Sequence, residues 1–197
     1  MHGYPFLFGK IYMDIKSIFL NSISISLFLL VACSIVFVYL NIFYFIYLKV
    51  PTLSANNKVI EKILRSIDFK GRKKFYDLGS GNGKLISGVA SLYPDLECIG
   101  IEYNIVAYYC AKTRNIFLKN KVSYLRENFF KVNLDDADIV YIYLFPGVMN
   151  RLEAKLANEL KSGTVVVVNS FPLKSKEPKK IIRRKFGALD TLYIYEY

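Results

Sequence analysis

Hydrophobic residues dominate the first quarter of the chain. From Ser17 to Leu48 no side chain is charged, and most residues are Ile, Leu, Val or Phe. About 20 apolar residues are enough for a helix to span a bilayer, and this tract is longer. A cleavable signal peptide has a shorter apolar part followed by a small-residue cleavage site, which is not evident here. The pattern predicts an N-terminal membrane anchor over residues 1–50, with a transmembrane helix over about residues 20–47.

Basic residues are distributed unequally on the two sides of this tract. Before it stand Lys10 and Lys16, partly offset by Asp14, whereas the region after it is rich in Lys and Arg. The basic residues that follow are Lys49, Lys58, Lys62, Arg65, Lys70, Arg72, Lys73 and Lys74. The positive-inside rule places the more basic flank in the cytoplasm. We therefore expect a single-pass membrane protein whose C-terminal domain, residues 51–197, is cytoplasmic.

Beyond Pro51, short apolar runs alternate with amphipathic segments, which indicates strands alternating with helices. Helices are predicted over residues 54–67 (with Ser54 as cap), 83–93, 105–118 and 148–160. Strands are predicted over residues 74–78, 98–102, 122–126, 139–144 and 164–168. Two further strands, 181–186 and 192–197, have no helix between them and are expected to form an antiparallel hairpin at the sheet edge. The pattern predicts an α/β fold, a Rossmann-like, doubly wound, mostly parallel sheet of seven strands.

The residue composition excludes several kinds of chemistry. The only histidine is His2, so neither a Ser-His-Asp triad nor a multi-histidine metal site can be built. The cysteines Cys33, Cys98 and Cys110 are far apart and form no CxxC pair, which argues against a disulfide framework or a zinc site. The net charge of +11 indicates an anionic neighbour. We expect no metal in this protein.

A glycine-rich turn follows the first predicted strand, in the sequence Asp77-Leu78-Gly79-Ser80-Gly81-Asn82-Gly83. Ligands of open α/β sheets bind outside the carboxyl ends of the strands, at such a turn. Glu102 ends the next predicted strand, where a carboxylate can accept hydrogen bonds from both ribose hydroxyls of a nucleoside. This layout is shared by NAD and S-adenosylmethionine.

Asp77 distinguishes between these two cofactors. A carboxylate two residues before the first glycine would repel the pyrophosphate of NAD, whereas the methionyl part of S-adenosylmethionine carries two positive charges. The spacing of Gly79, Gly81 and Gly83 also departs from the GxGxxG pattern. The sequence therefore predicts S-adenosylmethionine. Methyl transfer from this cofactor requires alignment and a desolvated site but neither a histidine nor a metal.

Several motifs together resemble a known family. They are Val50-Pro51-Thr52, DLGSGNGK, GIEYN at Gly100–Asn104, LFPGVMNRLEAKLANEL at Leu144–Leu160, and Phe171-Pro172. The stretch from Pro51 to Pro178 resembles the class I (seven-β-strand) methyltransferases. Within these it is most similar to the lysine N-methyltransferase family acting on ATP synthase c-subunit and adenine nucleotide translocase, with its prokaryotic relatives. The resemblance implies a protein-lysine acceptor and includes a hydrophobic N-terminal segment.

The turn, the following strand and the resemblance together identify candidate site residues. Those expected to bind the cofactor are Asp77, Gly79, Ser80, Gly81, Gly83, Glu102, Tyr103 and Asn128. Asn128 stands where class I methyltransferases often have an acid near the adenine. Candidates lining the acceptor site are Tyr103, Tyr143, Phe145 and Pro146, because an aromatic wall can hold a lysine by cation–π contact. Ordinary core packing is the alternative for these aromatics. Leu144 to Gly147 replace the Asn/Asp-Pro-Pro-Tyr/Phe motif of base and amide N-methylases, which argues against DNA adenine or a glutamine amide as acceptor.

The acceptor itself is open at this stage. The leading hypothesis is a lysine of a membrane or membrane-proximal protein. The alternatives are a small lipophilic acceptor, such as a lipid or quinone, and a non-catalytic module that only binds the cofactor. A basic run from Lys174 to Lys185 either contacts anionic lipid or is a solvated surface. The expected partners are the lipid bilayer and a protein substrate, without nucleic acid.

Overall fold

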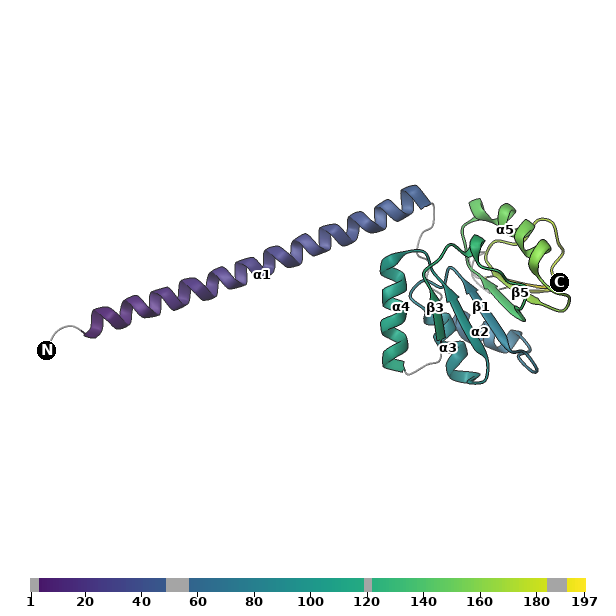
Figure 1. The fold of residues 1–197 in the computed structure, drawn as a ribbon, viewed down its shortest axis with the longest axis horizontal. Coiled ribbons are helices and arrows are strands. Elements are labelled where there is room, and N and C mark those ends of the chain that lie inside the picture. Colours follow the sequence, from purple (N-terminus) through teal and green to yellow (C-terminus); the bar gives the residue numbers. More distant parts are fainter. Residues whose placement is uncertain (1–3, 49–56, 119–121, 184–190) are drawn as a thin grey trace. The chain divides into compact units, whose positions relative to one another are not determined.

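The computed structural model describes residues 4–48, 57–118, 122–183 and 191–197 (Figure 1). The chain divides into two compact units, Met1–Leu48 and Lys49–Tyr197. The predicted helix cap at Ser54 lies outside the described residues, as does the predicted strand beyond Arg183.

The first unit is one continuous helix, α1 (Tyr4–Leu48). Its segment Lys16–Phe43 is long and apolar enough to cross a membrane, and none of it is buried within the structure. The polar side chains of this segment bond to the helix's own backbone: Ser22 Oγ donates to Ile18 O, and Asn41 Nδ2 donates to Phe37 O at 2.8 Å. Such internal bonds satisfy polar groups that a hydrocarbon environment cannot.

The second unit contains the predicted seven-stranded sheet, in the order β3-β2-β1-β4-β5-β7-β6. The strands are β1 (Lys74–Leu78), β2 (Glu97–Ile101), β3 (Val122–Leu125), β4 (Ile139–Ile142), β5 (Val165–Asn169), β6 (Lys180–Ile182) and β7 (Leu192–Glu196). The first five are parallel to one another, and β7 is antiparallel to both β5 and β6. The mixed sheet and the C-terminal antiparallel pair are therefore confirmed, with β7 inside the sheet and the short β6 at its edge.

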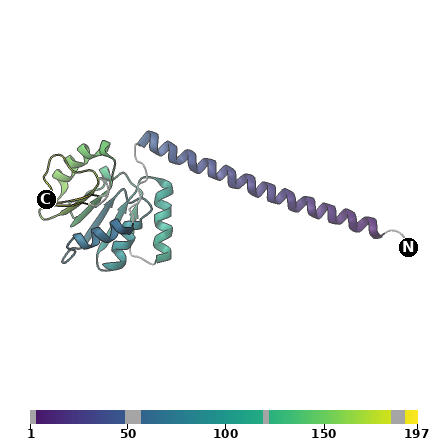
Figure 2. The ribbon, with the colours of Figure 1, turned by 180° about the vertical axis from the view of Figure 1, so that it is seen from behind.

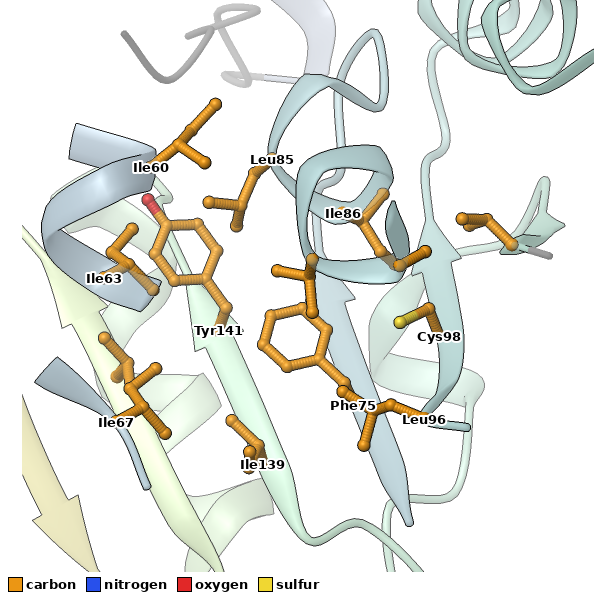
Figure 3. Packing of buried hydrophobic residues seen from close by; sticks show 14 of the residues in the cluster. Ile60, Ile63, Ile67, Phe75, Leu85, Ile86, Leu96, Cys98, Ile139 and Tyr141 are labelled. Carbon is orange, nitrogen blue, oxygen red and sulfur yellow. The ribbon is translucent and has the colours of Figure 1, made fainter. Parts of the chain in front are cut away.

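Helices cover both faces of this sheet, as a doubly wound fold requires (Figures 1 and 2). The helices are α2 (Asn57–Ser66), α3 (Lys84–Leu92), α4 (Ile105–Leu118) and α5 (Pro146–Glu159). Residues of α2, α3 and α4 pack with Phe75 and Tyr141 in one hydrophobic cluster, part of which Figure 3 shows. Residues of α5 and the short 3-10 helix η1 (Phe129–Lys131) pack with Tyr76 and Leu78 in a second cluster. Alternate residues of β1 thus point to opposite faces.

Several element boundaries differ from the sequence prediction by a few residues, and one short element was not predicted. Helix α5 begins at Pro146 rather than at residue 148, because proline is well suited to the first helical position, where its missing N–H costs nothing. The 3-10 helix η1 was not predicted; the Asn128 side chain caps it by accepting a hydrogen bond from Phe130 N at 3.0 Å.

Asp138 fastens the end of the sheet opposite to the glycine turn. Its Oδ2 accepts hydrogen bonds from Lys73 N at 2.7 Å and Lys74 N at 3.0 Å, and its Oδ1 lies 2.9 Å from Lys161 Nζ. Burial alone would raise the pKa of Asp138, but the bonds from Lys161 and the two backbone N–H groups outweigh it and lower the pKa below its usual value. The carboxylate therefore stabilises the folded state when it is ionised.

This arrangement makes the contribution of Asp138 dependent on pH. Because its folded pKa is lowered, its stabilisation is present above the unfolded pKa of about 3.9 and is lost as pH falls below it. We expect Asp138→Asn to lower the free energy of unfolding by about 1–3 kcal/mol at neutral pH, and the difference from wild type to shrink under acid. Thermal unfolding of the full chain in detergent checks this, with the exposed Asp135→Asn as control. Equal destabilisation at pH 7 and pH 3 would refute the role of the charge.

Candidate functional site

The parallel strands bring most of the predicted site residues to one edge of the sheet. In the strand register Leu78 of β1 lies beside Ile101 of β2 and Ile142 of β4, and Ile101 lies beside Leu125 of β3. The carboxyl ends of these four strands are therefore level. The residues that follow them, which include the glycine turn, Glu102, Asn128 and Tyr143, share that edge.

The glycine turn after β1 has a conformation that other residues would disrupt. Gly79 and Gly83 both have positive φ, 75° and 72°. A Cβ on Gly79 would lie 2.7 Å from Leu144 Cδ2, and one on Gly83 would lie 2.1 Å from Tyr124 Oη. Both positions therefore require glycine for backbone angle and for space. The turn is also fixed to β2, because Gly79 N and Ser80 N both donate to Ile101 O, at 2.8 and 3.0 Å.

Glu102 joins the glycine turn to the start of α4. Its Oε2 accepts a hydrogen bond from Gly81 N at 2.8 Å, and its Oε1 accepts one from Asn104 N at 2.7 Å. The side chain is buried, and burial raises the pKa of Glu102 even though these backbone N–H groups act to lower it. An ionised carboxylate has about four acceptor sites, so Glu102 can also accept hydrogen bonds from a ligand's hydroxyl groups.

Asp77 lies just beneath the turn as a second buried acid. Only 3% of the residue is exposed. Burial, and then the negative charge of Glu102, raise the pKa of Asp77 to about 8. A cationic ligand at the turn would relieve this cost and ionise the carboxyl group, whereas a pyrophosphate would increase it.

Ser80 adds a polar group that a ligand could satisfy. Its Oγ is buried and has no hydrogen-bond partner within the described part of the chain. An unsatisfied buried hydroxyl is costly unless something binds to it. The glycine cradle, the two acids and this hydroxyl fit S-adenosylmethionine, whose amino acid part is cationic near the sulfonium.

Three residues that were not predicted as site residues also hold the glycine turn and the start of α4 in place. Tyr124 Oη lies 3.3 Å from Ser87 Oγ and donates to Gly83 O, and Arg114 Nε donates to Asn82 O at 3.1 Å. Asn104 Oδ1 accepts from Val106 N and Ala107 N and so caps α4. An asparagine just before an apolar helical run is a recognisable cap signal, but nothing in the sequence marks Tyr124 or Arg114.

The predicted acceptor residues occupy unlike environments. Tyr103 is 52% exposed and Phe145 41% exposed, and Pro146 is exposed at the start of α5. The Phe145 ring lies 6.4 Å from that of Phe171. Tyr143, by contrast, is half-buried against the core cluster formed with α2 and α3. The geometry thus presents Tyr103 and Phe145 to a ligand more openly than Tyr143 or Phe171, which are both half-buried.

A strained turn after β5 positions Phe171. Ser170 has φ 72°, a left-handed conformation that costs a non-glycine residue about 1–3 kcal/mol. A buried network holds it: Ser170 N donates to Thr191 O, Ser170 Oγ donates to Asn169 Oδ1, and Asn169 Nδ2 donates to Tyr141 Oη. Nothing in the sequence marks Ser170, because serine carries no signal for a left-handed backbone.

The segment beyond Phe171 is fixed by two further buried groups. Glu153 of α5 accepts hydrogen bonds from Lys174 N and Ser175 N, both at 2.8 Å, and from the Ser175 hydroxyl. Tyr195 Oη accepts one from Leu173 N at 2.9 Å.

In the described residues no group of three or more His, Cys, Asp and Glu side chains is arranged to hold a metal ion.

Known proteins share this fold and these sequence features. The family model described as the ANTKMT methyltransferase domain matches residues 77–180. A protein-lysine N-methyltransferase from Saccharolobus islandicus is 30% identical over 149 residues, covering 74% of this chain and 92% of the relative. The adenine nucleotide translocase lysine N-methyltransferase of Mus musculus is 32% identical over 140 residues, covering 68% of this chain and 59% of the mouse protein.

A solved structure shows the same architecture. An RNA methyltransferase from Salinibacter ruber, in complex with S-adenosyl-L-homocysteine, superposes with a TM-score of 0.68 at 24% identity, covering 73% of this chain and 93% of that one. This likeness concerns the fold alone. Taken with the match over residues 77–180 and the Saccharolobus relative, it leads to one conclusion: the chain belongs to the ANTKMT methyltransferase domain family and is an S-adenosylmethionine-dependent methyltransferase.

Proposed function

We propose that this protein is a membrane-anchored protein-lysine N-methyltransferase that modifies acceptors close to the cytoplasmic membrane surface. The observation that carries the proposal is the pair of buried acids, Asp77 and Glu102, beneath a glycine turn. This pair fits a cationic nucleoside cofactor. The names of the Saccharolobus and mouse relatives support lysine as the acceptor.

Each part of the site has a distinct role in this proposal. Asp77 and Ser80 bind the methionyl part of the cofactor, and Glu102 binds the ribose. Asn128 is half-buried after β3, where its amide group can hydrogen-bond an adenine while its Oδ1 caps η1. The bound cofactor supplies a methyl group that is already activated by its sulfonium.

The acceptor amine must arrive without its proton, because an ammonium has no lone pair. Tyr103 follows β2, whereas Phe145 and Phe171, whose ring centres lie 6.4 Å apart, follow β4 and β5, so all three aromatic residues lie at the same edge of the sheet. A lysine that leaves water to pack against these rings is desolvated, which lowers its pKa and favours the neutral amine. Strain at Ser170 helps to hold Phe171 in this position, and the protein supplies alignment and desolvation rather than an imidazole base.

Helix α1 supplies the anchor in this proposal. Its Lys16–Phe43 segment is apolar and exposed, and the charge asymmetry of the sequence favours a cytoplasmic catalytic unit. Eight residues of sequence, 49–56, separate α1 from α2, and a chain of eight residues spans at most about 28 Å. The site therefore stays near the bilayer, where tethering raises the effective concentration of nearby acceptors.

Asp77 gives a first prediction. We expect Asp77→Asn to weaken S-adenosylmethionine binding by about 10-fold or more, because a charge-assisted contact is lost. Binding of S-adenosylmethionine to wild type near pH 7 should release protons as the Asp77 carboxyl group ionises. Calorimetry in two buffers of different ionisation enthalpy measures this proton release. Proton release that persists in Asp77→Asn would contradict the assignment.

The same substitution should affect the ligand-free protein in the opposite direction. The folded pKa of Asp77, about 8, is above the unfolded value of about 3.9. Stability linked to this group is thus fully present below pH 4 and is lost as pH rises towards 8. Asp77→Asn avoids that loss, so thermal unfolding should show it gaining stability over wild type as pH rises. The exposed Asp135→Asn, as control, should show no such trend.

The anchor gives a further prediction. With labelled cofactor and host membranes, we expect the full chain to place label on protein lysines. Deleting residues 1–48 should reduce this membrane methylation by about 10-fold or more, because effective concentration is lost. Methylation of a soluble lysine peptide should stay within about twofold, since the deletion leaves the effective concentration of a soluble acceptor unchanged.

Three outcomes would contradict parts of this proposal. Equal membrane methylation by the truncated and full chains would exclude the anchoring role. Label in lipid instead of protein would identify a small lipophilic acceptor. Cofactor binding without label in either fraction would favour a non-catalytic module.

A further inference from the structure

Helix α4 presents an apolar face to the outside of the catalytic unit. Tyr109 is 57% exposed and Ile116 is 75% exposed. With 3.6 residues per turn, Ile105, Tyr109 and Ile116 lie on one side of the helix. Ala107 and Ala111 lie on the opposite side, where they are buried against the sheet. The outward face, which in a soluble domain is normally polar, is here hydrophobic.

Among the described residues of the catalytic unit, no helix or strand covers this face (Figures 1 and 2). Figures 1 and 2 both show α4 at one end of the unit, with its outer side away from the sheet. The face is continuous with Tyr103, which is 52% exposed just before the helix. From Ile105 to Ile116 the helix rises by about 16 Å, so the apolar residues of this face extend over about three helical turns from a position shortly after Glu102.

The charges around this apolar stripe identify the kind of partner. From Tyr103 to Leu118 the sequence contains no acidic residue. Lys112 is the charged residue beside the stripe, because Arg114 faces inward and donates to Asn82 O. Lys112 is exposed, with its Nζ 5.5 Å from the centre of the Tyr108 ring. Tyrosines, aliphatic side chains and lysine on one exposed face are typical of helices that lie in the interface of an anionic bilayer. A second copy fits less well, because it would bring together two units that each carry excess positive charge.

We infer that the outward face of α4 rests on the surface of an anionic lipid bilayer. Tyr109 and Ile116 enter the headgroup region, and Lys112 lies among the lipid phosphates. Because Tyr103 and Ile105 stand at the carboxyl edge of the sheet, this contact places the methyl-transfer site at headgroup level. This contact rests on the proposed function, in which α1 spans the membrane. It is a second membrane contact, made by the catalytic unit itself.

The absence of tryptophan from the sequence provides a direct test. Single tryptophans are introduced into the full chain as Tyr109→Trp, Ile116→Trp, Phe28→Trp in α1 and Ala157→Trp on α5. Each variant is reconstituted into vesicles of phosphatidylcholine and phosphatidylglycerol, with and without doxyl-labelled phosphatidylcholine. Cofactor binding by each variant shows that it has folded.

We expect doxyl quenching and blue-shifted emission for Tyr109→Trp and Ile116→Trp, with quenching at least about twofold stronger than for Ala157→Trp. Adding Lys112→Glu to the Ile116→Trp chain should reduce its quenching, whereas adding Asn158→Glu, on α5, should not. Omitting phosphatidylglycerol from the vesicles should also reduce the quenching of Ile116→Trp.

The controls separate this inference from the anchoring proposal. If Phe28→Trp is quenched while Tyr109→Trp and Ile116→Trp behave like Ala157→Trp, the anchor stands and the α4 contact is wrong. If Phe28→Trp is not quenched, the anchor itself is wrong. Blue-shifted emission at positions 109 and 116 without doxyl quenching would mean that protein covers the face, which overturns the bilayer contact.

Discussion

The Glu102 carboxylate connects the parts of the site on which the activity depends. By accepting hydrogen bonds from Gly81 N and Asn104 N, it ties the turn after β1 to the start of α4. The glycine turn also positions the start of α3, where Ser87 N donates a hydrogen bond to Gly83 O at 3.0 Å. Asn104 caps α4, and α4 carries the apolar face next to the site. One buried acid thus fixes the relation between the cofactor turn and two helices.

This arrangement is electrostatically costly without a ligand. Asp77 and Glu102 are both buried, and each acid has a pKa raised by burial. A cation beside Asp77 offsets this cost and favours binding, and S-adenosylmethionine provides one in its methionyl part. The same physics disfavours NAD, whose pyrophosphate would approach the two carboxyl groups. The charge of the strand ends therefore favours the cofactor of this family, and in the proposed function the aromatic residues beside them favour the acceptor.

Much of this architecture could be predicted from the sequence because the signals were local. Apolar runs and turn residues located all seven strands, and the spacing of Asp77, the glycines and Glu102 located the turn and the strand end that frame the site. Features that depend on tertiary contacts were not predictable. The left-handed Ser170 is held by Thr191 and Asn169, and Tyr124 reaches the turn from a different strand. Helix α4 was located correctly, but its apolar residues gave no indication that they face outward.

The role of Glu102 is tested most directly by titrating the full chain, in detergent, with S-adenosylmethionine and separately with NAD, for wild type and Glu102→Ala. We expect wild type to bind S-adenosylmethionine and not NAD. We expect Glu102→Ala to bind S-adenosylmethionine at least about 30-fold more weakly, since the variant loses the ribose contacts and the hydrogen bonds that join the turn to α4. Unchanged affinity in Glu102→Ala, or binding of NAD in place of S-adenosylmethionine, would contradict this role.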